Sequence, residues 1–192
     1  MPFIISIICL SILCLGNSTL KITLNEAEAK KAFDYLNLVR QNPSKFSKEI
    51  GVDLSTVKSK PKLIWNDTLA KVAQKKAMDM AKRKYFNHVD PDGNGINILI
   101  YKAGYQVNPD WIKDKKSNYF ESIGAGIGSG EQTIRELIED KGIPSFSHRK
   151  HLLGMEGMRE YSFDCGIGIV DSDQSPYNSY CCIIIACKDF KK

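Results

Sequence analysis

The sequence lacks the patterns that mark several common classes of enzyme and binding protein. It contains no Gly-x-Ser-x-Gly elbow and no His-Glu-x-x-His motif, which argues against the usual serine hydrolase and metalloprotease designs. Its cysteines do not form Cys-x-x-Cys pairs, so a structural zinc site is not expected. The basic residues are spread along the chain without interleaved aromatic residues, which disfavours nucleic acid as a partner despite a net charge of +5.

Charged side chains are absent from residues 1–16, and the apolar run there is shorter than the roughly 20 residues that a membrane span needs. Small residues follow at 16–18. We therefore expect residues 1–18 to be a cleaved signal peptide and the protein to be secreted, with no transmembrane segment after cleavage. An uncleaved anchor and a buried N-terminal strand are the alternatives.

Cleavage would remove two cysteines and leave four near the C-terminus. In a secreted chain this clustering predicts disulfides, with three possible full pairings, whereas a reduced and buried set is the alternative. The candidates are Cys165, Cys181, Cys182 and Cys187. The sequence Asn66-Asp67-Thr68 is an N-glycosylation sequon, which makes Asn66 a candidate glycosylation site of the secreted protein.

Hydrophobic periodicity predicts helices first and a hairpin last. The helical segments are about 25–42, 67–85, 96–103 and 131–140, and the expected helix caps are Asn25 with Glu28 and Ser129 with Gln132. Apolar β runs are expected at 120–128, 165–170 and 180–187. This order predicts an α+β domain in which helices cover an antiparallel sheet.

Polar residues that can bind a metal or take part in acid–base chemistry come from three separate segments. Asp140 precedes His148 by eight residues across a Gly/Pro turn, His88 follows the second long helix, and Glu121 begins a strand. Two histidines and two acids brought together would form a polar cleft that can hold a divalent metal or do acid–base work. A hydrogen-bonded network that rigidifies the cleft without metal is the alternative.

Five segments, in this order, resemble the SCP or CAP superfamily of cysteine-rich secretory, antigen-five and pathogenesis-related proteins. They are 36–43, 63–70, 86–88, 121–123 and 137–149. The resemblance covers about 25–188 and is closest to the form common in bacteria and protists. It implies a three-layer α–β–α sandwich with an antiparallel central sheet. It also implies a groove whose metal ligands, for zinc or another divalent cation, are His88, Glu121, Asp140 and His148.

The chain departs from the family pattern at three positions. Asp140 stands where Glu is usual, and Glu139 is the alternative acid. Ser122 replaces an Asn, which would remove any amide hydrogen bond from that position. His151 stands where an Asn often follows, and we expect it to be a surface or capping residue.

Among the cysteines, Cys165 and Cys181 are the family-like pair and would fall on neighbouring strands. Cys182 should point to the opposite face from Cys181.

The resemblance implies a secreted binding protein that is non-enzymatic and has a sterol or fatty-acid ligand. A metal-dependent hydrolase using the same cleft is one alternative, although no nucleophile is evident. A defence or adhesion protein that acts through surface contacts with an extracellular protein partner is the other. Two further patterns are ordinary structure: the glycine-rich segment 124–130 predicts a close-packed strand and turn, and segment 90–95 is a turn without the carboxylate that would complete a calcium loop.

Overall fold

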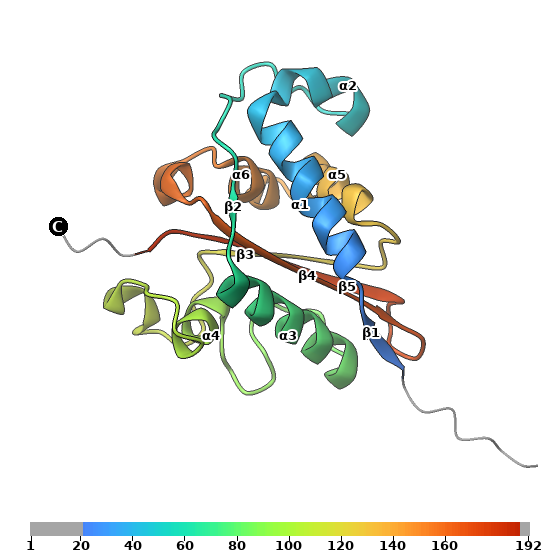
Figure 1. The fold of residues 1–192 in the computed structure, drawn as a ribbon, viewed down its shortest axis with the longest axis vertical. Helices are drawn as coiled ribbons and strands as arrows, with labels where there is room; N and C mark the ends of the chain where they lie inside the picture. The colour runs from blue at the N-terminus through green and yellow to red at the C-terminus, as the bar shows by residue number, and fades with distance from the viewer. Residues whose placement is uncertain (1–20, 189–192) are drawn as a thin grey trace, which may run out of the picture.

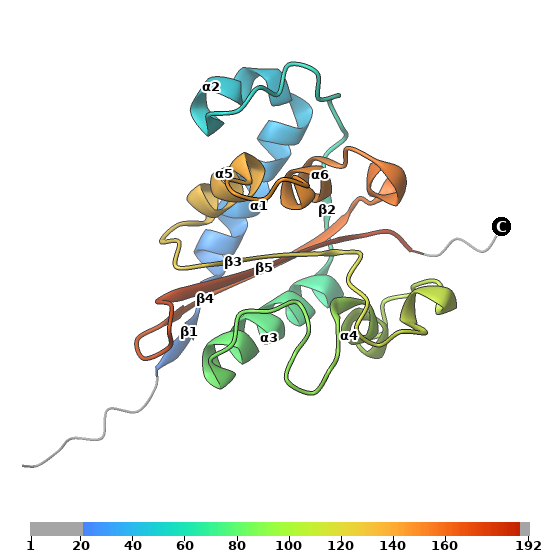
Figure 2. The same ribbon diagram turned by 180° about the vertical axis from the view of Figure 1, so that it is seen from behind.

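A mixed sheet separates two layers of helices in the computed structural model, which describes residues 21–188 (Figures 1 and 2). The expected signal peptide, residues 1–18, lies outside these described residues. The strands are β1 (Ile22–Leu24), β2 (Ile64–Trp65), β3 (Glu121–Ala125), β4 (Asp164–Ser172) and β5 (Ser179–Ala186). The α-helices are α1 (Glu26–Gln41), α2 (Ser47–Ile50), α3 (Asp67–Arg83), α4 (Ile96–Lys102), α5 (Gly130–Glu139) and α6 (Ser147–Leu153). The predicted α–β–α sandwich is confirmed.

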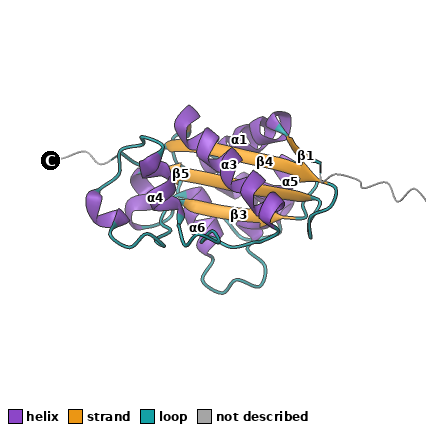
Figure 3. Ribbon diagram, turned by 90° about the horizontal axis from the view of Figure 1, so that it is seen from below, coloured by secondary structure: helices purple, strands orange, loops and turns teal. Residues whose placement is uncertain are grey.

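The strand order is β1-β4-β5-β3, so β3 forms one edge of the sheet (Figure 3). The pairs of this path are antiparallel, and the predicted C-terminal hairpin is the pair β4–β5. The short strand β2 differs from the prediction because it pairs with β4 in parallel. It leads directly into α3, and this pairing fixes where that helix begins.

Each face of the sheet carries its own hydrophobic core. Ile167 of β4 and Ile183 of β5 face α1, α5 and α6, whereas Cys182 and Ile184 of β5 face α3 and α4. The alternation follows from the two-residue period of a strand. A sheet buried on both faces needs apolar residues at successive positions, and this is why β5 reads as an uninterrupted apolar run.

Three polar residues begin the long helices as N-caps, two of them as predicted. The side chain of Asn25 accepts the N–H of Glu28, and that of Ser129 accepts the N–H of Gln132. Asn66 accepts the N–H of Leu69 in the same way at the start of α3. Glu28 does not complete a capping box; its carboxylate accepts the N–H of Gly130 at 2.7 Å and so ties α1 to α5.

Helix α6 replaces the simple turn expected around His148. It has only 7 residues, and its N-terminal flanking residue, Phe146, has a φ of 49°. A segment this short gives little periodic signal, and the Gly/Pro cluster before it predicts a turn. The strand β1 and the four-residue α2 escape prediction for the same reason.

Glycines on one face of β4 allow α3 to approach the sheet with its backbone. A Cβ at Gly166 would lie 2.1 Å from the backbone nitrogen of Ala70, and one at Gly168 would lie 2.3 Å from that of Gln74. These distances are far below any van der Waals contact, so no side chain fits at either position. Alternate glycines in this strand are therefore a packing requirement of α3.

The four described cysteines are unpaired, which corrects the disulfide prediction. In the β4–β5 register, Cys165 lies opposite Ile185 and Cys181 lies opposite Ile169. The two cysteines are thus offset by four residues, or roughly 13 Å along the strands. A disulfide requires Cα atoms within about 7 Å, so this family-like pair cannot form here.

Cys182 and Cys187 are also unpaired. Cys182 points to the opposite face from Cys181, as predicted, and Cys187 follows the end of β5, five residues further along. Cys182 and Cys187 belong to the core on the α3 side, whereas Cys165 and Cys181 belong to the other core. The alternative of a reduced and largely buried set is the one that the structure contains.

We expect Gly166→Ala to lower the free energy of unfolding by about 1–3 kcal/mol, because the new methyl group would push α3 away from β4. Gly128→Ala is the matched control, since a Cβ there would meet nothing within 4 Å. Urea denaturation of both variants measures the difference. Equal stability of the two variants would contradict the packing role of Gly166.

Candidate functional site

The first histidine–carboxylate pair joins the loop after α3 to the edge strand β3. Nδ1 of His88 lies 2.8 Å from Oε2 of Glu121. The Glu121 side chain is fully buried, whereas 39% of the His88 side chain is exposed. The second carboxylate oxygen of Glu121 accepts the thiol of Cys182 at 3.3 Å. The carboxylate is thereby held on both oxygens, and the imidazole it orients reaches solvent.

Lys76 of α3 holds the loop that carries His88. Its Nζ donates to the backbone oxygens of Asn87 at 2.9 Å and His88 at 3.0 Å. Only 3% of Lys76 is exposed. Periodicity places Lys76 on the inner face of the helix, but it does not reveal that the ammonium group positions this loop.

The second pair lies between the end of α5 and the start of α6. Oδ1 of Asp140 lies 2.7 Å from Nδ1 of His148, while Oδ2 accepts the backbone N–H groups of His148 at 3.0 Å and Arg149 at 3.2 Å. Asp140 is the C-cap of α5 with a φ of 56°, a left-handed conformation that aspartate tolerates better than most residues. The acid of this pair is therefore Asp140 and not Glu139, whose backbone oxygen accepts Arg149 instead.

A third histidine links the two elements that carry these pairs. Nδ1 of His151 lies 2.8 Å from Oγ of Ser122, and its Nε2 lies 3.4 Å from the backbone oxygen of Ile185. Because a carbonyl only accepts, Nε2 carries the proton and Nδ1 accepts the Ser122 hydroxyl. Only 4% of His151 is exposed, so the prediction of a surface or capping residue is wrong.

Burial is also the main reason why the pKa of His151 falls to about 3, helped by the nearby charges of Arg159 and Arg40. Arg40 of α1 is itself fully buried and donates to the backbone oxygen of Leu152 in α6 at 2.6 Å. These contacts fix α6 against both α1 and β3. The hydrogen bond between Ser122 and His151 thus stands in place of the amide hydrogen bond that the family's asparagine was expected to supply.

The two pairs lie on opposite faces of the sheet beside its β3 edge. Successive residues of a strand point to opposite faces. Glu121 faces the α3 layer, where it meets Cys182, while Ser122 faces α6, which carries His148 and His151. Within residues 21–188, no group of three or more His, Cys, Asp or Glu side chains is placed to hold a metal ion. The four residues therefore form two pairs and not one four-ligand cluster.

The other sequence patterns have local structural roles. Oδ1 of Asp90 accepts the N–H groups of Asp92 and Asn94, which makes segment 90–95 a turn, as predicted. A Cβ at Gly130 would lie 2.0 Å from the backbone oxygen of Glu28, so the glycine-rich segment packs closely at this end, whereas a Cβ at Gly128 would meet nothing within 4 Å. Asn66, the candidate glycosylation site, is partly buried and uses its side-chain oxygen as the α3 cap.

The model of the family described as "CAP: Cysteine-rich secretory protein family" matches residues 33–184. The chain belongs to the CAP family. The matched segment contains both histidine–carboxylate pairs of this CAP domain and all of its sheet except β1 and the end of β5. None of the curated proteins compared with the chain gives a significant match.

Two solved bacterial structures are similar to this CAP domain. One is an extracellular protein containing an SCP domain from Bacillus anthracis, with a TM-score of 0.55 and 19% identity over 85% of this chain. The chain spans only 41% of that protein's chain. The other is an outer surface protein from Borrelia burgdorferi, with a TM-score of 0.55 and 15% identity, covering 86% of this chain and 98% of that one. These likenesses establish the fold.

The sequence predicts no transmembrane segment after cleavage of the signal peptide. Among the described residues, no helix combines the length and the apolar composition that a membrane crossing requires.

The buried His151 predicts a specific pH dependence of stability. Its pKa of about 3 in the folded protein lies below the ordinary value of 6.5, so folding favours the neutral ring. The contribution of His151 is complete above pH 6.5 and is lost as pH falls toward 3, by up to about 1.4 kcal/mol per pH unit. We expect denaturation curves of His151→Asn to lose stability less steeply than wild type between pH 6 and 4. Parallel curves would show that His151 does not titrate with unfolding.

Proposed function

We propose that this CAP domain is an extracellular, non-enzymatic binding protein whose His88 and His148 hold a divalent cation such as zinc at the β3 edge. The observation that carries the proposal is the same in both pairs: a fully buried carboxylate lies on Nδ1 of a histidine that remains partly exposed. A carboxylate at one ring nitrogen fixes the tautomer and leaves the other nitrogen free, as is usual for metal-binding histidines. Nδ1 carries the contact in both cases, and among residues 21–188 Nε2 has no hydrogen-bond partner.

The carboxylates then orient the ligands and are not ligands themselves. Each oxygen of Asp140 is already within hydrogen-bond distance of a nitrogen, and both oxygens of Glu121 are engaged by His88 and Cys182. Of the four metal ligands that the family resemblance implies, the proposal therefore keeps only the imidazoles of His88 and His148. A zinc ion held by two histidines would complete its coordination with water or a bound ligand. Such a site suits recruitment of a ligand to the surface of the protein.

A hydrolase using the same residues has less support. The thiol of Cys182, which contacts Glu121, is one candidate nucleophile, but burial and the neighbouring Glu121 charge raise its pKa well above the ordinary value. A thiol in that state is protonated and unreactive at neutral pH. The side chain is also fully buried.

A groove between α1 and α3 supports a second ligand, a fatty acid or sterol. Its volume is about 600 Å³, and its apolar wall includes Ala29, Trp65 and Ala70. Phe33 of α1 packs edge-to-face on Trp65 with ring centroids 5.2 Å apart. Lys30 and Lys71 also line the groove; Lys30 is paired with Asp34, so Lys71 is the cation that would meet a fatty-acid carboxylate. Ligand pockets combine such an apolar wall with a few polar groups.

We expect isothermal titration of the purified domain with zinc to give about one ion per chain. His88→Ala and His148→Ala should each abolish this binding, because a single imidazole remains in either variant. Asp140→Asn should weaken the zinc affinity about 10–100-fold, since the ring of His148 loses its orienting charge.

Circular dichroism of each variant shows whether the fold is intact. A folded wild type that takes up no zinc would overturn the proposal and leave the two pairs as structural networks.

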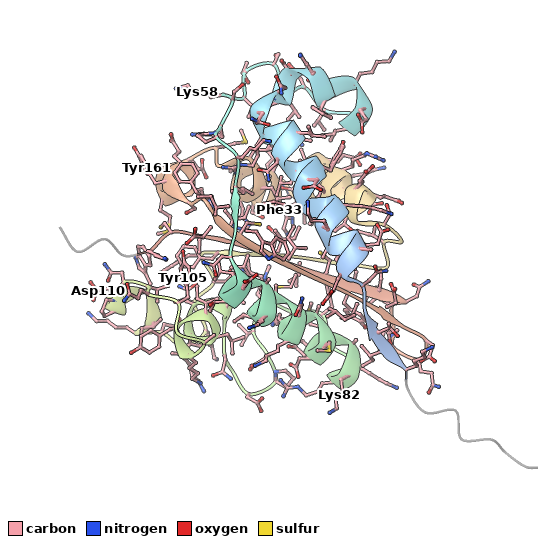
Figure 4. All side chains as sticks on the ribbon, in the orientation of Figure 1. Phe33, Lys58, Lys82, Tyr105, Asp110 and Tyr161 are labelled. Carbon is pink, nitrogen blue, oxygen red and sulfur yellow. The ribbon has the colours of Figure 1, made fainter. Side chains whose placement is uncertain are left out.

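We expect labelled palmitate to bind saturably and to quench the fluorescence of Trp65. Trp65→Ala should weaken this binding, because the indole forms part of the groove wall. Tyr161→Ala is the control, since this ring is 73% exposed and lies away from the groove at the margin of the domain (Figure 4). Equal affinity of the two variants would show that the lipid does not occupy the groove.

A further inference from the structure

A second cavity, separate from the groove and from the two pairs, lies between α3 and α4. Its volume is about 370 Å³. Val72, Leu99 and Ala103 supply apolar wall, and the side chains of Lys75, Lys76 and Lys102 also line it. A pocket of this size holds a small organic molecule or a lipid headgroup.

Lys76 is the unusual member of this wall, because a lysine this deeply buried normally has a carboxylate partner. Its Nζ donates to two neutral backbone oxygens and lies 5.0 Å from the centre of the Tyr85 ring. No ion pair of Lys76 occurs within residues 21–188. An ammonium group has three N–H donors, and two of them are used here.

The two acids of the cavity wall are occupied by other groups. Asp79 accepts two guanidinium N–H bonds from Arg83, and the hydroxyl of Tyr85 as well. Asp90 accepts backbone and side-chain N–H groups of the turn that it closes. Among residues 21–188, neither carboxylate forms an ion pair with Lys75, Lys76 or Lys102.

The other two lysines lie at the rim of the cavity and form few contacts through their ammonium groups. Lys75 and Lys102 are exposed, and neither forms an ion pair with any described residue. The nearest hydrogen-bond partner of Lys102 is Oδ1 of Asn94, at 3.4 Å. One buried and two exposed ammonium groups therefore line the cavity without an ion-pair partner among residues 21–188, while Asp79 in its wall is paired with Arg83, which also lines it.

We infer that this cavity binds a phosphate group, carried either by a small organic phosphate or by a lipid headgroup. Lysine ammonium groups are compact point charges with freely rotating donors, and they bind phosphate without the fixed geometry that arginine demands. The apolar wall formed by Val72, Leu99 and Ala103 would contact the organic part. This inference does not depend on metal binding at the β3 edge.

Phosphate binding in this cavity should also affect the His88–Glu121 pair. The buried Nζ of Lys76 holds the backbone oxygens of Asn87 and His88, so an anion that draws on its third donor alters the support of that loop. The ring of His88 then provides a reporter remote from the rim lysines. A shift of its signals on phosphate binding connects the two sites.

The test is an NMR titration of the domain with inorganic phosphate at constant ionic strength. We expect saturable shifts at Val72, Leu99 and His88, and we expect Lys75→Ala/Lys102→Ala to weaken phosphate at least about tenfold, the equivalent of 1.4 kcal/mol. Lys82→Ala is the matched control. This lysine is exposed on α3 and lies outside the cavity at the C-terminal end of the helix (Figure 4).

A second arm uses phosphatidylcholine vesicles with and without phosphatidic acid. Vesicle binding that requires phosphatidic acid and is lost in the double lysine variant identifies a lipid headgroup, whereas saturation by inorganic phosphate alone identifies a free phosphate. Absence of saturation in both arms would overturn the inference. An equal loss in Lys82→Ala would overturn it too, since binding would then follow net charge and not the cavity.

Discussion

Side-chain alternation along the edge strand β3 is the constraint on which the candidate site depends. Glu121 and Ser122 are neighbours in the chain, yet one side chain enters the α3 layer and the other enters the α6 layer. Each then anchors a different histidine. The two histidine–carboxylate pairs can share a ligand only around the edge of the sheet, because the sheet itself separates their buried carboxylates.

The position of α3 determines one half of that site. Two glycines of β4 let the helix backbone approach the sheet, and the helix carries Lys76 on its inner face. The ammonium group in turn fixes the loop of His88. A packing feature in the central strand is therefore transmitted to an imidazole at the surface through one buried lysine.

The sequence predicts local and periodic features well, and it predicts less where a long-range register decides the outcome. The caps at Asn25 and Ser129 follow from short-range hydrogen bonding, and the hairpin β4–β5 follows from its apolar runs. Side-chain alternation along a strand correctly predicts that Cys181 and Cys182 point to opposite faces of the sheet. It cannot show that Cys165 is displaced by four residues from Cys181, because that offset is set by the loop and the sheet register.

The site was predictable to the same extent. The family resemblance indicates the residues of both pairs, and only the left-handed cap at Asp140 distinguishes it from Glu139. The buried bond between Ser122 and His151 could not be read from spacing, because α6 is too short to show which of its faces is inside. Lys76 was hidden for a related reason: an inward lysine in a periodic pattern does not reveal what its ammonium group contacts.

The unpaired cysteines have a consequence for how the sandwich is held together. Cys165, Cys181 and Cys182 are buried side chains of the two cores, and burial raises the pKa of each thiol above its ordinary value. Their protonated sulfurs pack as small apolar groups. No disulfide joins the described cysteines, so non-covalent packing and hydrogen bonds maintain the sandwich within residues 21–188. Each of these three sulfurs already occupies a place in a core as a thiol, so the packing of the sandwich uses the reduced form of the side chain.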